Sequence, residues 1–291
     1  MTRLEELQTG KGHRDENFPV ASFIIRPQHR AAIMAFYRFV RAADDVVDNG
    51  AAAASDKLKL LDTLRRSLIG ETNDVPQGVA LRKALTERGL SSQHAEDLLE
   101  AFRRDVTKLR YKDWDDLIDY CRYSAMPVGR FVLDVHGEPR ALWSMNDALC
   151  AALQIINHLQ DCAEDFKQLN RVYIPLDALD AAGLDVEALR EPRASPELKT
   201  VISSLAARCG TLLDQSRPFA AAIHDRRLGL EVSVIQQLAE DLVRKLERKD
   251  PLSQRVHHDK LETLGLAGAA TARFIAGRIG AKRSRAAVSA Q

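Results

Sequence analysis

Two pairs of aspartates in this chain of 291 residues are spaced so that a helix would present both members of each pair on one face. Asp44 and Asp48 form the first pair, and Asp161 and Asp165 form the second. Residues four apart lie on the same side of a helix. The neighbours of both pairs are mostly apolar, and carboxylates are rarely buried among such residues unless another charge or a metal offsets them. We therefore expect both pairs to line a polar cavity.

Four carboxylates that face one cavity would repel one another, and some would take up protons. Divalent cations remove this repulsion. Mg²⁺ prefers oxygen ligands and usually combines one or two carboxylates with the phosphate oxygens of a substrate. The spacing therefore predicts a Mg²⁺ site, with Asp44, Asp48, Asp161 and Asp165 as ligands. Such a site would bind a phosphorylated compound and stabilise its phosphate as a leaving group.

Other polar side chains share the faces of these two helices or follow them. Tyr37 and Arg41 lie on the face of the first pair, Gln154 and Asn157 lie on the face of the second, and Arg171 follows the second pair. Guanidinium groups bind phosphate through two hydrogen bonds, so Arg41 and Arg171 are expected to bind it here. We predict that Asn157 or Gln154 positions a water molecule.

A third segment is expected to form part of the cavity wall. Tyr120, Ser124, Pro127 and Phe131 share one face of a helix predicted over 113–136. Pro127 lacks a backbone N–H, so it predicts a kink in the middle of this helix. Tyr120 offers a hydroxyl and an aromatic face to a carbocation. An ordinary half-buried tyrosine is the alternative interpretation.

The chain is expected to be all-α, because apolar residues recur at helical spacing almost throughout. The predicted helices cover 28–49, 56–69, 77–88, 92–110, 113–136, 144–169, 196–224, 227–248 and 260–279. We find no linker and no internal repeat. This predicts a single domain over 1–291, a helical bundle around a central cavity, with flexible ends at 1–18 and 280–291.

Composition and motifs argue against several other classes of protein. The net charge of +1, from 42 basic and 41 acidic residues, gives no reason to expect nucleic acid as a partner. No glutamate is followed by histidine three residues later, which is the spacing of di-iron bundles. The four cysteines stand singly and are expected to be small buried residues in a reducing cytosol.

No run of about 18 apolar residues predicts a membrane span, and the polar N-terminal segment has no signal-peptide pattern. We therefore expect a cytoplasmic protein. The C-terminal segment, 273–291, is basic. It is expected either to be solvated or to contact the anionic inner face of the membrane as a peripheral protein.

The chain resembles the squalene/phytoene synthase family over nearly its whole length. The resemblance rests on "ASFIIRPQHRAAIMAFYRFVRAADDVVD" (21–48), "YCRYSAMPVG" (120–129) and "LQIINHLQDCAEDFKQLNRVYIP" (153–175). It implies an isoprenoid-synthase-like fold in which the two aspartate pairs are the Mg²⁺–diphosphate motifs. It implies catalytic roles for Tyr120, Tyr37, Arg41 and Asn157. The substrate-binding residues would be Ser22, Phe23, Phe36, Arg41, Ser124, Phe131, Gln154, Asn157 and Arg171.

Three departures from the better-known members favour one branch of this family. Gln160 stands where an arginine is usual, "SAMPVG" replaces a "VAGxVG"-like stretch, and Arg171 follows Asp165 at an unusual spacing. With "HRDENFPVAS" (13–22) and "DPLSQRV" (250–256), the chain is similar to the bacterial hydroxysqualene synthase subfamily of hopanoid biosynthesis.

This resemblance implies a Mg²⁺-dependent reaction that ionises presqualene diphosphate, rearranges the carbocation and quenches it with water to give hydroxysqualene. Other enzymes of the pathway would supply the substrate and take over the product. The alternatives are a squalene or presqualene diphosphate synthase that joins two farnesyl diphosphates, a phytoene synthase, and a lipid-binding helical scaffold without catalysis. The use of NADPH and the oligomeric state stay open.

Overall fold

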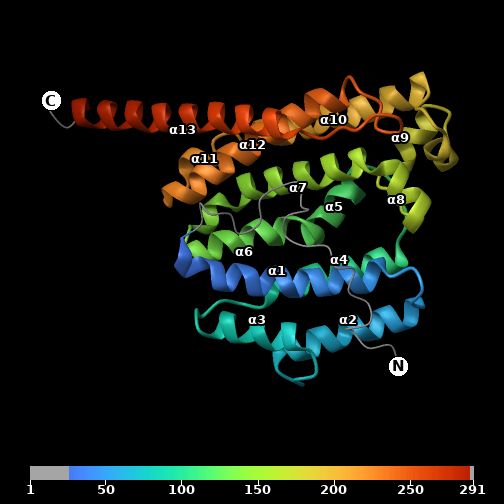
Figure 1. Ribbon diagram of the computed structural model, residues 1–291, viewed down its shortest axis with the longest axis horizontal. Coiled ribbons are helices and arrows are strands. Elements are labelled where there is room, and N and C mark those ends of the chain that lie inside the picture. The colour runs from blue at the N-terminus through green and yellow to red at the C-terminus, as the bar shows by residue number, and fades with distance from the viewer. Residues whose placement is uncertain (1–25, 289–291) are drawn as a thin grey trace.

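The computed structural model describes residues 26–288, with side chains described up to residue 278 (Figure 1). The helices are α1 Pro27–Asp48, α2 Ala54–Ile69, α3 Pro76–Thr86, α4 Gln93–Thr107, α5 Trp114–Ser124, α6 Met126–His136, α7 Trp143–Gln160, α8 Cys162–Leu169, α9 Leu176–Ala181, α10 Pro196–Ser216, α11 Phe219–Ala222, α12 Arg226–Leu246 and α13 Lys260–Val288, with short 3₁₀ turns η2 Arg140–Leu142 and η3 Val186–Arg190. No strand occurs in this part of the chain, and the predicted all-α class is confirmed.

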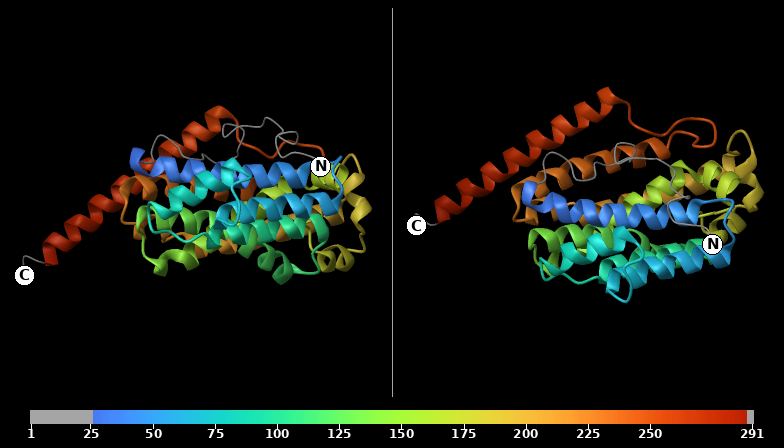
Figure 2. Two further views of the ribbon diagram at one scale, coloured as in Figure 1. Left: turned by 90° about the horizontal axis from the view of Figure 1, so that it is seen from below. Right: turned by 60° about the horizontal axis from the view of Figure 1, so that its bottom comes forward.

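The helices run roughly along the long axis of the molecule and stack in layers across it. In Figure 1, α2 and α3 form the lowest layer, α1 and α4 lie above them, α5 to α7 follow, and α10 to α13 cover the top. The end of α13 projects beyond the other helices in the views of Figures 1 and 2.

Two clusters of buried apolar side chains stabilise this stack. One joins α1 to α4 and includes Phe131 and Val135 of α6. The other extends from α4 to α12. The aromatic rings of Phe36 and Phe131, both in the first cluster, stack with centroids 3.9 Å apart and tie α1 to α6.

Two helices predicted as continuous are each divided by one residue. Ala125, with φ −125° and ψ −49°, separates α5 from α6, and Pro127 lies in the first turn of α6. The predicted kink in the middle of a helix is therefore wrong, because proline at the start of a helix removes no hydrogen bond that the helix would otherwise make. Asp161, with φ −104° and ψ 11°, likewise separates α7 from α8.

The connection after α8 turns the chain back towards α1 and α4. Asn170 adopts a left-handed conformation with φ 53°, and the N–H of Arg171 donates to the carbonyl of Asp165 across the turn. The next residue, Val172, donates its N–H to the carbonyl of Leu109 at 3.0 Å. This turn brings Arg171 back beside the end of α1.

The segment 170–185, for which the sequence predicts an irregular connection, contains α9, and η3 follows it. The helix predicted over 196–224 ends at Ser216, and α11 follows after Pro218. The predicted flexible end 1–18 lies outside the described residues. At the other end, the backbone of α13 continues to Val288.

Gly129 of α6 allows α6 to approach α7 closely. A Cβ atom at this position would lie 1.9 Å from Asn146 Oδ1 and 2.7 Å from Cys150 Sγ. We expect Gly129→Ala to lower the free energy of unfolding by about 1–3 kcal/mol, the usual cost of overpacking. Denaturant titration measures this change.

Gly210→Ala on α10 is the matched control, because its Cβ would meet nothing closer than Val243 Cγ1 at 3.8 Å. We expect this change to leave the free energy of unfolding unaltered or to raise it by up to about 1 kcal/mol, since alanine favours helix. Equal effects at the two glycines would contradict the close packing of α6 against α7.

Candidate active site

The two aspartate pairs lie at the same end of the helical stack. Asp44 and Asp48 end α1, and Asp161 and Asp165 lie at the junction of α7 and α8, which is on the right in Figure 1. Arg171 Nη1 contacts Asp48 Oδ1 at 2.9 Å, so the chain that follows the second pair is tied directly to the first. The tertiary structure thus brings together two motifs that are far apart in the sequence.

Guanidinium groups offset the negative charge of two of these aspartates, and a histidine lies beside a third. Arg41 Nη1 lies 2.9 Å from Asp44 Oδ2, and Arg171 pairs with Asp48. His158 Nδ1 lies 3.4 Å from Asp165 Oδ2. The predicted role of Arg41 and Arg171 at this end is therefore consistent with their position, since a guanidinium beside these carboxylates is also close to where a diphosphate would bind.

The arrangement of the four carboxylates fits Mg²⁺ ions that share a substrate. Their oxygens are hard donors, and the side chains of Asp44, Asp48 and Asp165 are half-buried rather than sealed inside the protein. Among the described residues, no three of the four carboxylates have oxygens within 4.8 Å of one another. This spread suits ions that complete their coordination with water and diphosphate oxygens rather than a closed protein cage.

A second cluster with metal-ligand chemistry lies elsewhere and has another explanation. Ligand atoms of His29, His136 and Asp225 lie within 4.8 Å of one another. The carboxylate of Asp225 is already engaged, because it accepts the N–H groups that begin α12 and pairs with Arg26 at 3.0 Å. We therefore interpret this cluster as a helix cap, since the adjacent guanidinium disfavours a cation there.

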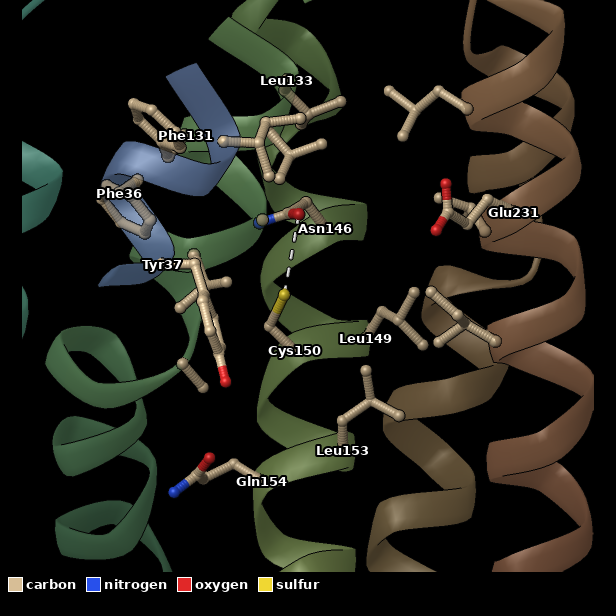
Figure 3. A pocket seen from close by; sticks show the side chains of 18 of the residues that line it. Phe36, Tyr37, Phe131, Leu133, Asn146, Leu149, Cys150, Leu153, Gln154 and Glu231 are labelled. Carbon is tan, nitrogen blue, oxygen red and sulfur yellow. Dashed lines mark hydrogen bonds between the residues drawn. The ribbon is translucent and has the colours of Figure 1, made fainter. Parts of the chain in front are cut away.

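We call the end of the helical stack that carries Asp44, Asp48, Asp161 and Asp165 the acidic end. An apolar pocket of about 320 Å³ adjoins it (Figure 3). Residues of α1, α6, α7 and α12 form most of its wall. The lining includes these predicted site residues: Phe36, Tyr37, Ser124, Phe131, Gln154 and Asn157. Asn157 lies one turn before Asp161 on α7, so the pocket reaches the second aspartate pair. A phosphorylated head and a long apolar tail can thus be bound in adjacent places.

Sequence reasoning missed two polar residues of the pocket wall. Asn146 of α7 and Glu231 of α12 both line it, and Glu231 is only 4% exposed. Figure 3 shows the Glu231 carboxylate directed into the pocket from the side opposite Asn146. The signal that could have found Glu231 is its position on the same face of α12 as Leu228, Val232 and Ile235, since an acid among apolar residues also marked the aspartate pairs.

Tyr120 does not line the pocket. Its side chain is buried behind the acidic end, where its hydroxyl donates to Asp105 Oδ2 at 3.0 Å. The hydroxyl of Tyr173 donates to Asp105 Oδ1 at 3.2 Å. Burial raises the pKa of Asp105 to about 6. The expectation that Tyr120 walls the pocket is therefore corrected, although its part in the carbocation steps stays a prediction.

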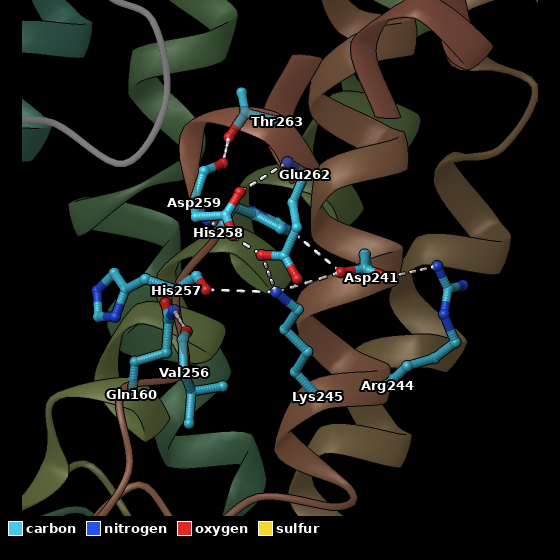
Figure 4. Close-up of polar contacts among 10 residues, drawn as sticks. All are labelled: Gln160, Asp241, Arg244, Lys245, Val256, His257, His258, Asp259, Glu262 and Thr263. Carbon is cyan, nitrogen blue, oxygen red and sulfur yellow. Dashed lines mark hydrogen bonds and ion pairs between the residues drawn. The ribbon is translucent and has the colours of Figure 1, made fainter. Parts of the chain in front are cut away.

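Gln160 makes a contact that the sequence did not indicate. Its Nε2 donates to the carbonyl of Val256 in the segment between α12 and α13 (Figure 4). The same segment is held by Lys245 Nζ, which donates to the carbonyl of His257 at 3.3 Å, and by His258, whose Nε2 lies 3.0 Å from Asp241 Oδ2. Gln160, which departs from the family pattern, is thus in direct contact with the segment 250–256, which the sequence also associates with the hydroxysqualene synthase branch.

Two predicted substrate-binding residues, Ser22 and Phe23, lie outside the described residues. The roles of the other predicted site residues stay predictions, although the structure places all of them at the pocket, at the acidic end or just behind it. Asp105, Tyr173 and His158 had not been predicted. A buried aspartate in the last turn of α4 carries no recognisable signal in the sequence alone.

Comparisons with known proteins agree on the kind of protein. Residues 12–262 match the family model described as squalene/phytoene synthase. The chain is 58% identical over 262 residues to the hydroxysqualene synthase of Rhodopseudomonas palustris, and the match covers 90% of each protein. It is 54% identical over 252 residues to the hydroxysqualene synthase of Sinorhizobium fredii, and this match covers 87% of this chain and 86% of the relative.

Solved structures share the fold. The squalene synthase HpnC from Alicyclobacillus acidocaldarius is 32% identical, with a TM-score of 0.72, and the match covers 84% of this chain and 92% of that one. A dehydrosqualene synthase in complex with a ligand is 20% identical, with a TM-score of 0.77 and coverage of 90% and 93%. The predicted isoprenoid-synthase-like fold is confirmed.

The contact between Gln160 and Val256 generates a stability prediction. We expect Gln160→Ala to lower the free energy of unfolding by about 1–3 kcal/mol, because the buried carbonyl of Val256 loses its donor. Amide hydrogen exchange over 250–259 should become faster in this variant.

Gln168→Ala is the control, since Gln168 Nε2 makes an exposed bond to Glu164 within α8. We expect its free energy of unfolding to stay within about 0.5 kcal/mol of the unaltered protein. If exchange over 250–259 were unchanged in Gln160→Ala, the proposed attachment of this segment would be wrong.

Proposed function

Because this chain belongs to the squalene/phytoene synthase family, we propose that it converts presqualene diphosphate to hydroxysqualene. Identities of 54–58% with three hydroxysqualene synthases support this activity. The structural observation that carries it is an acidic, half-buried end that adjoins an apolar pocket. Such a site suits a substrate that has one diphosphate and a hydrocarbon body.

We propose Mg²⁺ as the cofactor, with Asp44, Asp48, Asp161 and Asp165 as its ligands. When bound, the ions neutralise the diphosphate and make it a better leaving group. Arg41 and Arg171, already oriented by Asp44 and Asp48, bind the remaining phosphate charge. These groups act in a partly dehydrated site, where electrostatic interactions are stronger than in water.

The wall of the pocket controls the cation. The bond from carbon to the diphosphate oxygen breaks with its electron pair, and the resulting cation rearranges among Phe36, Tyr37 and Phe131. A water oxygen then forms a bond to the final cation, and the water releases a proton. Gln154 and Asn157 line the pocket and are the residues that we propose to position this water.

A second candidate is a squalene or presqualene diphosphate synthase that joins two farnesyl diphosphates. The 32% identical relative that is called a squalene synthase favours it. Two observations weigh against it: the higher identity to hydroxysqualene synthases, and the side chain of Gln160. The Gln160 amide is neutral, so it supplies no positive charge for a second diphosphate, and it is already engaged by Val256.

We propose peripheral contact with the inner face of the membrane, where an apolar product can leave and be handed over to the next enzyme. No described helix is long and apolar enough to span a bilayer. On α13, however, Leu261 is 81%, Leu264 is 72% and Ile275 is 51% exposed. Isolated exposed apolar residues are common, but three on one projecting helix support membrane contact.

Incubation with substrate tests the proposed activity. We expect the purified protein to form hydroxysqualene from presqualene diphosphate when Mg²⁺ is present, without NADPH, and to stop when the metal is chelated. Gas chromatography with mass spectrometry identifies the product. Squalene formed from farnesyl diphosphate, and only with NADPH, would instead establish the second candidate.

Removal of one proposed metal ligand gives a further prediction. We expect Asp161→Ala to lower the rate of diphosphate release by about 10²–10³-fold, the range seen when one electrostatic stabiliser is lost. Asp180→Ala changes an exposed aspartate on α9 and should leave the rate unaltered. Activity of Asp161→Ala equal to that of the control would contradict the metal assignment.

A further inference from the structure

Asp105 holds two tyrosine hydroxyls behind the acidic end of the pocket. Each of its carboxylate oxygens accepts one phenol: Oδ2 accepts from Tyr120 at 3.0 Å and Oδ1 accepts from Tyr173 at 3.2 Å. All three side chains are buried. Because a hydroxyl has a single proton, both phenols have their protons directed at Asp105 and away from the pocket.

The aromatic rings around Asp105 are packed together. The centroids of Tyr120 and Tyr173 lie 5.6 Å apart, and Tyr111 lies 5.1 Å and 5.5 Å from these two rings. His158 stacks on Tyr173 with a centroid distance of 3.4 Å. The cluster therefore fixes the orientation of both phenols and leaves them little freedom to rotate.

This cluster is connected to both parts of the site. His158 Nε2 lies 2.8 Å from Nε2 of Gln154, which lines the pocket. The other ring nitrogen, His158 Nδ1, lies 3.4 Å from Asp165 Oδ2. Ser124, one turn after Tyr120, also lines the pocket. Asp105 itself does not line the pocket, and each of its carboxylate oxygens is engaged by a tyrosine hydroxyl.

A purely structural role does not explain why a carboxylate occupies this buried position. Burial of an ionised group costs several kcal/mol unless partners compensate for it, and well-packed apolar side chains stabilise such a site at least as well. The charged and titratable groups that face Asp105 are Tyr111 from the segment between α4 and α5, Tyr120 from α5, His158 from α7, and Arg171 and Tyr173 from the segment after α8. All of these except Tyr111 favour its charged form.

We propose that Asp105 is a positioning residue of the reaction: it directs the hydroxyl protons of Tyr120 and Tyr173 away from the substrate and gives both phenols extra negative charge. A phenol that donates to a carboxylate carries more electron density on its oxygen and ring. Although neither ring lines the pocket, the added negative charge stabilises a cation there electrostatically, and the phenols offer no proton to it. The inference rests on the proposed function, because it requires a cationic intermediate.

Because the role proposed for Asp105 requires its negative charge, kcat should depend on the pH at which this carboxyl ionises. Burial raises the pKa of this carboxyl to about 6, whereas Arg171, the two hydroxyls and His158 lower it. The carboxylate is therefore ionised at neutral pH and becomes protonated as the pH falls below about 6. The cation should lose its stabilisation in the same range, since a neutral carboxyl no longer adds negative charge to the phenols.

The test compares Asp105→Asn with the unaltered enzyme from pH 5 to pH 8, with presqualene diphosphate and Mg²⁺. At pH 7.5 we expect kcat to fall by about 10- to 100-fold, as for loss of a residue that orients a functional group. KM should change less than about 3-fold, because no diphosphate ligand is altered. The ratio of the two kcat values should shrink towards 1 below about pH 6, where the unaltered enzyme loses the same charge.

The pH dependence of this kcat ratio distinguishes a positioning role of Asp105 from a purely structural role. The ionisation of the substrate affects both enzymes equally and cancels in the ratio. Asp250→Asn is the control, since Asp250 is also buried but accepts bonds from Ala194, Leu252 and Ser253 in a surface segment. The ratio of its kcat to that of the unaltered enzyme should not depend on pH. A ratio for Asp105→Asn that is equally independent of pH would overturn the proposal.

A second variant keeps the proposal testable if Asp105→Asn does not fold, which circular dichroism reveals. Tyr173→Phe keeps the ring and the charge of Asp105 but removes one donor that lowers the pKa of this carboxyl. The acidic limb of its kcat profile should therefore move to higher pH. An unmoved limb would contradict the assignment of that limb to Asp105.

Failure of the proposed function would be visible separately. If the unaltered enzyme released no diphosphate from presqualene diphosphate but consumed farnesyl diphosphate, the substrate assignment would fail. The same variants would then be compared with farnesyl diphosphate, whose ionisation also gives a cation. Their pH-dependent ratio would still support or overturn the role of Asp105.

Discussion

The ion pair between Arg171 and Asp48 is the interaction on which the site depends. It joins residues that are 123 positions apart and fixes the end of α1 against the segment after α8. Without a positive charge at this point, the carboxylates that end α1 and begin α8 would repel one another. The left-handed Asn170 places Arg171 there, because it reverses the chain immediately after α8. One backbone conformation thus brings the two acidic motifs to the same end of the fold.

The pocket follows from how the two apolar clusters meet. Helices α4 and α6 contribute side chains to both clusters, and the stacked rings of Phe36 and Phe131, which belong to the cluster that joins α1 to α4, hold α1 against α6. The remaining space is lined by α1, α6, α7 and α12 and stays apolar except at a few positions. A cation formed there meets aromatic rings before it meets bulk water, which is what a controlled rearrangement requires.

Behind the acidic end, buried polar groups are arranged in layers rather than singly. Asp48 and Asp165 face Arg171 and His158, and these in turn lie near the tyrosines that Asp105 holds. Gln160 adds a buried bond to Val256 in the segment between α12 and α13. Each buried charge has a partner of opposite sign or a hydrogen-bond donor nearby, which is why so many ionisable groups are tolerated in a small volume.

The sequence by itself determined the helices and the polar faces that they carry, because both follow from a periodicity of 3.6 residues that is local to each segment. It therefore identified the aspartate pairs, Gln154 and Asn157, and the family. It did not indicate the breaks at Ala125 and Asp161, since one altered pair of backbone angles leaves the periodicity intact. The tertiary structure alone decided that Tyr120 binds Asp105, that Glu231 lines the pocket and that Gln160 reaches Val256. Those contacts join distant segments, and no local pattern of residues records which segments become neighbours when the chain folds.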